Sequence, residues 1–399
     1  MPRSRKNHAF SNRSMRILFA AFLLSLSYDF SYSQTHTISG TVRDAATKEP
    51  LSASNIRVQG TSRGTISNMN GDYRLSLPPG SYTLIFSFVS YRSDTVRIVL
   101  AENKVRNISL QPSAIQMTEV VVTAEDPAYG IMRKVIENKY RWLDSLRSYQ
   151  LEAFTRQVLR RDTSIAGITE SYTTGYWQKG DTLREVVRQK RQTENVSFAQ
   201  NVTSIGGILN FYQDEIRFSG FTFIGPTAKN AFDYYGYKLE QTREESGNDI
   251  YTIRLLPNSR IIPLFSGTIT IVSESYSVIG IEVSPNEAFN IPFVNDLSIR
   301  YSQQFALYEN RFWMPVDIRI KGSLKIGVTG ISIPGIGFEQ VSSLYDYKIN
   351  IDLPDTVFRK PRRTVAAEAE RFDSSYWAQG EVLPLTNEEQ EAYNTLDST

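Results

Sequence analysis

The sequence of 399 residues predicts a mainly β protein, in which a small N-terminal β-sandwich is followed by an antiparallel α+β domain. Residues 36–112 alternate between apolar and polar side chains over short runs, the pattern of half-buried strands. Residues 149–357 repeat this pattern in longer runs, separated by turn-forming residues. Between the two stretches lies a segment of helical periodicity, which begins after Asp126. A chain of this length can form two or three domains with substantial cores.

The alternation is clearest around residue 85. Tyr82, Leu84, Phe86 and Phe88 point to one face of a predicted strand, and the polar Thr83 and Ser87 point to the other, together with Ile85. Turn chemistry marks the breaks between such runs, as at Asn70-Gly71-Asp72. About seven strands at this spacing predict a small antiparallel sandwich.

Several short motifs in this stretch occur in a specific order. They are Ser39-Gly40-Thr41-Val42-Arg43-Asp44, Glu49-Pro50-Leu51, Gly60-Thr61, Gly64-Thr65, Asn70-Gly71-Asp72-Tyr73 and Phe86-Ser87-Phe88-Val89-Ser90-Tyr91. With them, residues 36–112 resemble the carboxypeptidase-regulatory-like domain, a transthyretin-type β-sandwich. The resemblance implies a fold module without catalytic activity of its own.

Residues 1–33 have the composition of a secretory signal peptide. Five Lys or Arg residues precede an apolar run from Ile17 to Leu26, and Ser31-Tyr32-Ser33 suits a small-residue cleavage site. The run is about ten residues long, whereas a transmembrane helix needs about 20. We therefore expect an exported protein, located in the periplasm or on the periplasmic face of the outer membrane. A short membrane anchor is the alternative interpretation.

The net charge and the cysteine content limit the kinds of partner and chemistry that this protein can have. Without residues 1–33, the formal net charge changes from +2 to −2, because five basic residues and one acidic residue are removed. Such a balance does not favour nucleic acid as a partner. The chain has no cysteine, which excludes disulfides, thiolate chemistry and a lipid anchor on cysteine.

Residues 113–126 are expected to form a linker or an edge strand. Within them, Thr118-Glu119-Val120-Val121-Val122-Thr123 looks like the segment that follows this domain in TonB-dependent receptors. Asp126 and Pro127 suit the N-cap and first position of a helix that runs to about Arg147. We expect its apolar face to pack on the protein's own sheet; a helix on a membrane surface is the alternative.

Residues 127–357 are expected to combine this helix with an antiparallel meander. Four pairs of strand-like segments are each separated by a turn-forming stretch. The pairs are residues 167–177 with 182–191, 237–242 with 250–255, 267–273 with 277–283, and 297–307 with 312–327.

The remaining residues, 358–399, are expected to be a C-terminal connector or tail without chemistry. Residues 364–372 are rich in Ala, Glu and Arg and predict a helix. Thr386 and Glu389 form a capping box before a second short helix, which ends near Leu396.

Two further resemblances concern the second domain. Residues 267–283, 297–305 and 312–316 are similar to the half-barrel sheet of lipoprotein-carrier proteins, which wraps a helix and can hold acyl chains. From His36 to Asp397 the chain also resembles envelope proteins with a carboxypeptidase-regulatory-like domain. In longer members a barrel in the outer membrane follows, and the resemblance implies that this barrel is missing here.

A dense group of aromatic residues between positions 211 and 237 is the candidate ligand or partner surface. Three interpretations are open: the core of a β domain, an apolar groove for lipid or peptide, and rings that stack on sugars. The candidate residues are Phe211, Tyr212, Phe221, Phe223, Phe232, Tyr234 and Tyr235.

The sequence contains no catalytic constellation, so we expect no enzymatic activity, no cofactor and no metal. His36 is the one histidine outside the predicted signal peptide, and it lies beside the predicted new N-terminus, whereas a Ser-His-Asp triad needs an imidazole held by the fold. No zincin, nucleophile-elbow or P-loop motif occurs. Carboxylate pairs like those of glycosidases stay open, because sequence spacing does not reveal their separation.

Three functions follow in order of preference. The first is a non-enzymatic envelope protein that binds or scaffolds outer-membrane or other envelope proteins. The second is a periplasmic carrier of lipids or lipoproteins that uses a half-barrel groove. The third is a hydrolase of glycans or peptidoglycan that depends on carboxylates.

Overall fold

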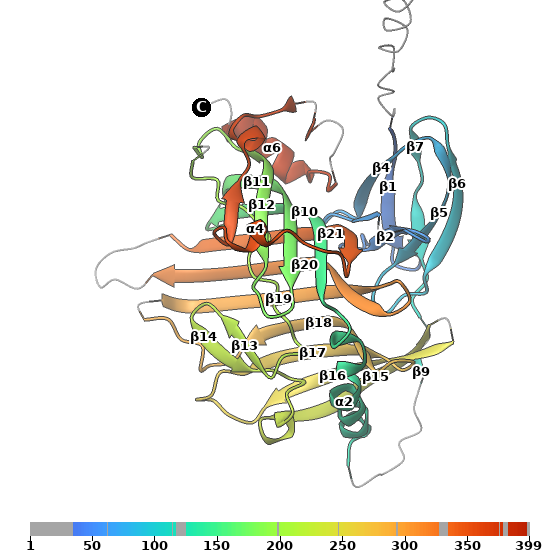
Figure 1. Cartoon of the computed structure of the whole chain (residues 1–399), viewed down its shortest axis with the longest axis vertical. Coiled ribbons are helices and arrows are strands. Elements are labelled where there is room, and N and C mark those ends of the chain that lie inside the picture. Colours follow the sequence, from blue (N-terminus) through green and yellow to red (C-terminus); the bar gives the residue numbers. More distant parts are fainter. Residues whose placement is uncertain are drawn as a thin grey trace, which may run out of the picture. The chain divides into compact units, whose positions relative to one another are not determined.

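The computed structural model describes residues 35–61, 63–113, 115–116, 125–197, 199–245, 247–292, 294–326, 334–374, 376–377 and 382–396 (Figure 1). The predicted signal peptide and most of the predicted linker lie outside these residues. Residues from His36 onward belong to one unit. The prediction of a mainly β protein with a sandwich and a larger β-rich part is confirmed. The boundaries proposed for the domains stay predictions.

The N-terminal part is a sandwich of two four-stranded sheets. One sheet has the order β4-β1-β7, with β8 also paired to β1, and the other has the order β3-β2-β5-β6. The strands are β1 His36–Asp44, β2 Asn55–Val58, β3 Gly64–Ile66, β4 Asp72–Leu77, β5 Gly80–Ser87, β6 Asp94–Leu100, β7 Lys104–Val105 and β8 Ile108–Leu110.

The sandwich is not purely antiparallel, contrary to the prediction. β1 pairs with β7 and β8 in parallel. Parallel neighbours need a long connection, and here the chain passes through the second sheet before it returns to β1. Alternation along one strand carries no information about the direction of a partner that lies more than 60 residues away.

The turn at Asn70-Gly71-Asp72 has the chemistry that the sequence predicted. The side-chain oxygen of Asn68 accepts the N–H groups of Asn70 and Asp72, both at 2.9 Å. Gly71 has a positive φ of 80°, and a Cβ there would lie 2.5 Å from the carbonyl oxygen of Val42. Glycine is therefore required at this position.

The predicted helix begins where expected but ends earlier. Helix α2 spans Pro127–Asn138 and a short helix, α3, spans Tyr140–Leu143. The Asp126 side chain accepts the N–H of Ala128, as an N-cap should. The expected continuation to Arg147 is wrong, because the N–H of Arg147 donates to the side chain of Asn350 instead of a helical carbonyl. No helix among the described residues has the length and apolar character needed to cross a membrane.

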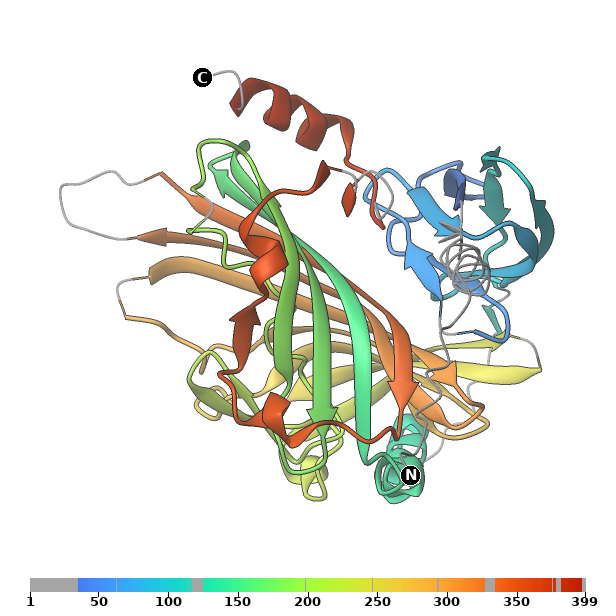
Figure 2. The ribbon, with the colours of Figure 1, turned by 45° about the horizontal axis from the view of Figure 1, so that its top comes forward.

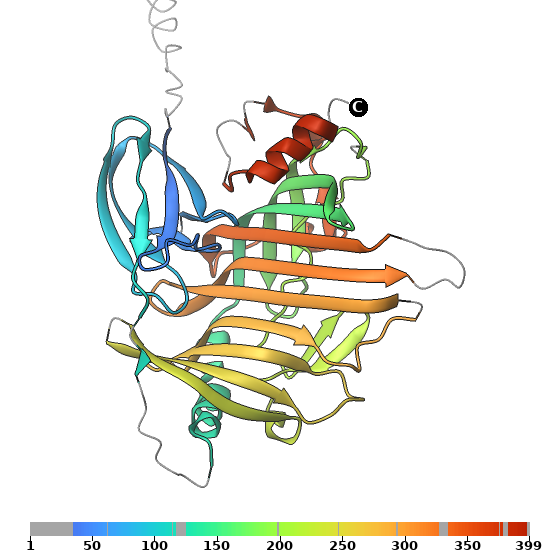
Figure 3. The ribbon, with the colours of Figure 1, turned by 180° about the vertical axis from the view of Figure 1, so that it is seen from behind.

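The larger part is a single twelve-stranded sheet with the order β22-β12-β11-β10-β21-β20-β19-β18-β17-β16-β15-β9. All four predicted strand pairs are confirmed as antiparallel neighbours. Figure 3 shows the strands from β15 (yellow) to β21 (orange-red) side by side, and Figure 2 shows how strongly the sheet bends toward β10–β12 (green). The strands are β9 Ile115–Gln116, β10 Ser148–Arg161, β11 Ser164–Gln178, β12 Arg184–Gln192, β15 Tyr235–Glu245, β16 Asn248–Pro257, β17 Phe265–Val272, β18 Ser277–Pro285, β19 Val294–Tyr308, β20 Phe312–Ile326, β21 Ile336–Ile349 and β22 Arg363–Val365.

The two faces of this sheet differ in chemistry. We call the face that carries Ile253, Ile269 and Ile281 the inner face, because these side chains belong to the main core with Met132 and Val135 of α2. A hairpin of β13 Glu215–Phe218 and β14 Phe221–Ile224 and the 3₁₀ helix η1 Ala231–Asp233 contribute to the same core. Side chains alternate along a strand, so the other, outer face carries the residues between them.

The C-terminal residues depart from the prediction of a helix at 364–372. Residues Arg363–Val365 instead form β22, which pairs with the edge strand β12, and one 3₁₀ turn, η2, spans Ala367–Glu370. Edge pairing satisfies backbone groups that would otherwise remain open on β12. The capping box is confirmed: Thr386 and Glu389 exchange side-chain-to-backbone hydrogen bonds at the start of helix α6, Asn387–Leu396. A short helix α4, Asp355–Phe358, precedes β22.

The N-cap of α2 gives a test of this fold. The Asp126 carboxylate also accepts the N–H of Leu239 at 3.0 Å, so it joins α2 to β15. We expect Asp126→Ala to lower the free energy of unfolding by about 1–2 kcal/mol, measured by chemical denaturation. The matched control is Glu125→Ala, which removes an exposed ion pair with Arg133 and should change little. Equal effects of the two substitutions would contradict the role of Asp126.

Candidate functional site

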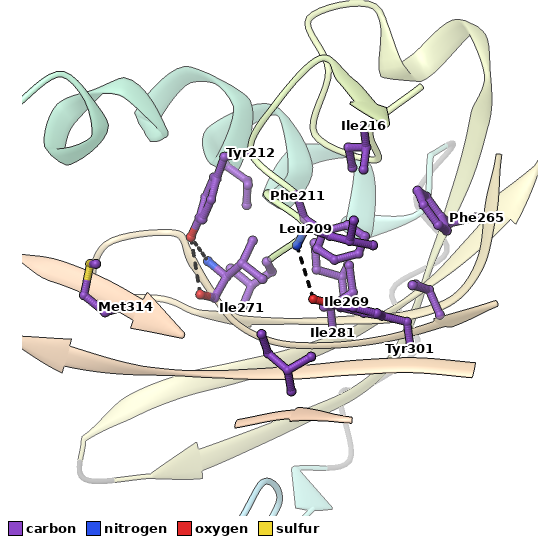
Figure 4. Close-up of a cluster of buried hydrophobic side chains, with 14 of the residues drawn as sticks. Leu209, Phe211, Tyr212, Ile216, Phe265, Ile269, Ile271, Ile281, Tyr301 and Met314 are labelled. Atoms are coloured by element: carbon purple, nitrogen blue, oxygen red, sulfur yellow. Dashed lines mark hydrogen bonds between the residues drawn. The ribbon is translucent and has the colours of Figure 1, made fainter. Parts of the chain in front are cut away.

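The candidate aromatic residues lie in and against the main core (Figure 4). The rings of Phe223 and Phe265 stack at 4.5 Å, and the Tyr212 hydroxyl accepts the N–H of Val278 at 2.7 Å. Burial raises the pKa of the Tyr212 and Tyr235 hydroxyls, which therefore stay neutral. Phe211, Tyr212, Phe223 and Tyr235 are buried, whereas Phe221, Phe232 and Tyr234 are half-buried against the same core.

This arrangement fits the core interpretation of the aromatic group. The inner face of the sheet is occupied by the protein's own side chains, including Leu209, Phe211 and Ile216 (Figure 4). That these residues form an apolar ligand surface stays a prediction. A ligand could reach them only if the chain between β12 and β15 moved away.

A buried lysine that the sequence did not single out holds this segment in place. Lys139, between α2 and α3, is only 2% exposed. Its ammonium group donates to the carbonyl oxygens of Tyr212 and Thr227, both at 2.9 Å, and to the Asp214 carboxylate at 2.8 Å. Three acceptors match the three N–H donors of an ammonium, which makes burial of the charge tolerable.

A second buried group, Glu185 on β12, secures the same segment from the sheet. Its carboxylate accepts the N–H groups of Ile205 and Gly206 at 2.7 and 3.1 Å. Burial raises the pKa of Glu185 to about 7, although these hydrogen bonds act in the opposite direction. Its oxygens are engaged by the backbone, so the geometry assigns this carboxylate a structural role.

On the outer face, a cavity of about 260 Å³ lies where the sandwich, the sheet and the C-terminal segment meet. Arg156, Val341 and Arg319 are direct cross-strand neighbours on β10, β21 and β20, and their side chains form its floor. Met69 of the sandwich and Leu383 of the C-terminal segment form its walls. None of the seven candidate aromatic residues lines this cavity.

One side of the cavity rests on a buried ionic network. The Glu170 carboxylate on β11 accepts from Arg156 at 2.8 Å and from Arg191 on β12 at 2.5 Å. It also accepts the hydroxyl of Tyr393, on α6, at 2.7 Å. The guanidinium group of Arg156 also pairs with the carboxylate of Glu389 at 3.2 Å, which completes the network. Helix α6 is thereby attached to the outer face by charge-assisted hydrogen bonds.

The network keeps these groups ionised in spite of their burial. Burial alone would raise the pKa of Glu170, but the positive charges of Arg156 and Arg191 outweigh this effect and lower it. Burial also opposes the charge of Arg156, and the carboxylates of Glu170 and Glu389 reverse the effect and raise its pKa. The charges depend on one another, so removing one would leave the others buried without a partner.

Arginine side chains also attach the sandwich to the sheet. Arg319 donates to the hydroxyl of Ser52 at 2.5 Å and to the carbonyl oxygen of Ser67 at 3.0 Å. Arg57 donates from the sandwich to the carbonyl oxygen of Leu307 at 2.8 Å. These bonds fix the sandwich on the outer face through main-chain as well as side-chain acceptors.

A small apolar cluster adjoins the network. Ile66 of the sandwich packs there with Phe154 and Tyr172 of the sheet and with Trp377 and Leu383 of the C-terminal segment. All three parts of the unit therefore share one buried cluster. The expectation that residues 358–399 are merely a surface connector is wrong for Trp377, Leu383 and Tyr393, because their side chains are buried.

Each cation of the cavity has an acidic partner within 4 Å. Besides the network, Arg319 pairs with Asp317 at 3.1 Å, and Lys321 with Glu339 at 3.2 Å. Arg300 pairs with Glu282 at 3.2 Å. The described residues contain no group of three His, Asp or Glu side chains that could hold a metal ion. The arrangement is therefore suited to binding a ligand of low net charge.

Sequence reasoning missed Arg156, Glu170 and Arg319, although a signal existed. All three are charged residues on the outer face of the sheet. The residues two positions away along each strand share that face, and they are apolar or charged. Arg156 and Glu170 are cross-strand partners in the β10–β11 hairpin. Arg319 comes close to them only through the pairing of β10 with β21, which joins residues about 185 positions apart. Local patterns do not encode that pairing.

Two family models match the chain. Residues 38–122 match the CarboxypepD_reg-like domain, and residues 159–343 match a family of unknown function, DUF5686. The N-terminal sandwich is thus similar to a CarboxypepD_reg-like domain. This confirms the resemblance that the sequence motifs carry. The DUF5686 match covers most of the twelve-stranded sheet, including β20 and part of β21, whereas most of β10, with Arg156, lies before it.

The CarboxypepD_reg-like domain also relates the chain to outer-membrane receptors. The TonB-dependent receptor SusC of Bacteroides thetaiotaomicron is 29% identical over 129 residues, which are 32% of this chain and 12% of the receptor. The TonB-dependent receptor P39 of Formosa agariphila is 28% identical over 123 residues, 30% of this chain and 11% of the receptor. The match thus spans about an eighth of the length of these relatives. The chain is related to the N-terminal regions of such receptors, which supports a location in the cell envelope.

Solved structures give weaker likenesses. A putative outer membrane lipoprotein-sorting protein domain from Vibrio parahaemolyticus has 11% identity and a TM-score of 0.29, covering 58% of this chain and 97% of that one. A LolA superfamily protein from Nitrosomonas europaea has 16% identity and a TM-score of 0.24, with the same coverage.

The ionic network predicts a large effect of one isosteric substitution. We expect Glu170→Gln to lower the free energy of unfolding by about 3–5 kcal/mol, because Arg156 and Arg191 lose their buried counter-charge. Hydrogen exchange in α6 should become faster at the same time. The control is Glu388→Gln on the same helix, whose carboxylate pairs with Arg160 and is 56% exposed, and which should change stability little. An unchanged exchange rate in α6 of Glu170→Gln would contradict the role of the network.

Proposed function

We propose that the chain is a non-enzymatic protein of the cell envelope, which binds or scaffolds outer-membrane components. The observation that carries the proposal is the attachment of a CarboxypepD_reg-like sandwich to one face of a large sheet. Arg319 and Arg57 hold the sandwich by hydrogen bonds, and the Glu170 network holds the C-terminal segment beside it. Such an arrangement fixes three surfaces relative to one another, as a scaffold requires.

The chemistry of the charged groups supports a binding role over catalysis. A general acid or base needs a titratable group that is free to exchange a proton with a substrate. Glu170 and Glu389 are engaged by arginines, and Glu185 is engaged by backbone N–H groups. None of these three carboxylates is therefore free to act as the acid or base of a hydrolase.

The carrier interpretation would need space on the inner face of the sheet. In the described structure that face is covered by α2 and by residues such as Leu209, Phe211 and Phe223, which are all buried. An acyl chain could enter only after this segment had left, at the cost of its contacts with Lys139 and Glu185. We therefore place binding through the outer face and the sandwich first.

The test is affinity purification of the chain from the envelope of its own host. Tagged chain, starting at His36, serves as bait, and Arg57→Ala/Arg319→Ala, which loosens the sandwich from the sheet, serves as the matched control. We expect the intact chain to enrich specific outer-membrane proteins over empty beads, and the control to enrich them at least several-fold less.

Two results would contradict the proposal. One is that no envelope protein is enriched over empty beads. The other is turnover of labelled peptidoglycan or glycan by the purified chain, lost on Glu185→Gln or Glu170→Gln without loss of folding. Co-purified acyl chains in stoichiometric amount would favour the carrier function instead.

A further inference from the structure

The outer-face cavity borders an example of peptide recognition within the chain itself. Residues 382–386 form an irregular segment that bends at Leu383 and lies between the sandwich and the sheet. Thr65 donates to the carbonyl oxygen of Val382 at 2.5 Å, and Asn68 donates to that of Pro384 at 3.2 Å. Side chains on both sides thus bind the main chain of this segment.

Arg156 recognises the same segment from the floor of the cavity. Its guanidinium donates to the carbonyl oxygens of Leu383 and Pro384 at 2.8 and 3.1 Å. The Leu383 side chain, in turn, is 2% exposed and forms part of the cavity wall. The mode of binding is therefore donors on carbonyl oxygens combined with an aliphatic side chain in an apolar recess.

The cavity offers the same two elements, cationic donors and an apolar recess, beside this segment. Lys321 and Arg300 stand at its rim, 69% and 67% exposed, and each has one acidic partner among the described residues. An ammonium has three N–H donors and a guanidinium five, so donors remain for a ligand. Val158, Val341 and Met69 contribute apolar side chains to the lining of the cavity.

The size and charge of the cavity restrict the ligand. A cavity of about 150 Å³ can hold a benzene ring, so about 260 Å³ accommodates one leucine or phenylalanine side chain. The acidic partners of all four cavity cations disfavour an anion such as phosphate. The apolar side chains that line the cavity are aliphatic and not aromatic. Sugar sites, in contrast, use aromatic faces for stacking.

We propose that this cavity binds an extended peptide segment of an envelope protein, whose apolar side chain fills the recess over Val341 and whose carbonyl oxygens accept from Lys321 and Arg300. The inference rests on the proposed function and names the kind of partner that the scaffold holds. The segment would lie beside residues 382–386 and be bound by the same chemistry.

The test is photo-cross-linking in cells of the native host. The chain carries p-benzoyl-phenylalanine at Met69, which lines the cavity and is 54% exposed, or at Val99, a sandwich position outside the lining that is 62% exposed. Mass spectrometry then maps each adduct to residues of the partner. We expect the Met69 probe, and not the Val99 probe, to label one short segment with an apolar residue at its centre.

A synthetic peptide of the mapped segment gives the second measurement. We expect Lys321→Ala/Arg300→Ala to weaken its binding to the full chain at least tenfold. Lys325→Ala/Arg260→Ala, which removes the same charge from exposed positions paired with Asp296 and Glu287, should not weaken it. Thermal unfolding of both variants monitors folding.

Several outcomes would overturn the inference. They are equal labelling from Met69 and Val99, no labelling from Met69, adducts that are lipids or glycans, and peptide affinity that is insensitive to Lys321→Ala/Arg300→Ala. If affinity purification still enriches envelope proteins in that case, the scaffold function stands and only the assignment of the cavity fails. If both fail, the proposed function fails as well.

Discussion

The Glu170 carboxylate is the point on which the outer face of this protein depends. It is fully buried, and it is compatible with folding because Arg156, Arg191 and Tyr393 all donate to it. Burying charge is expensive unless each charge is paired and hydrogen-bonded, so these groups must come together as a set. Since Tyr393 belongs to α6 and the arginines belong to the sheet, the C-terminal segment is a required part of the fold. Its docking in turn creates one wall of the cavity and the path of residues 382–386.

The edges of the twelve-stranded sheet are partly protected against pairing with strands of other molecules. Its two edges carry very short strands, β9 with two residues and β22 with three, so long edges with open backbone groups are partly covered. One face is closed by the main core, which includes α2 and the aromatic group. The other face is available for the sandwich, the C-terminal segment and, in our account, a partner. This division of the two faces explains why the apolar aromatic residues became core, whereas the candidate binding site contains paired charges.

Local patterns in the sequence predicted local structure well. The strand pairs around the turns at 178–181 and 273–276 were predictable, because both strands and their turn lie within about 25 residues. The start of α2 was predictable because Asp126 and Pro127 act within one helical turn. The failure of the helix to continue to Arg147 was not, because the N–H of Arg147 donates to Asn350, about 200 residues away. The parallel partners of β1, the pairing of β10 with β21, and hence the cavity, were equally beyond reach, since cross-strand neighbours follow from register and not from composition.

We expect the sandwich, the sheet and the C-terminal segment to unfold as one cooperative unit, because hydrogen bonds from Arg57, Arg156 and Arg319 join them. Differential scanning calorimetry of the chain from His36 onward measures this cooperativity most directly. A single transition, with a calorimetric enthalpy equal to the van't Hoff enthalpy, is the predicted result. Two resolved transitions, with the sandwich unfolding independently of the sheet, would contradict it.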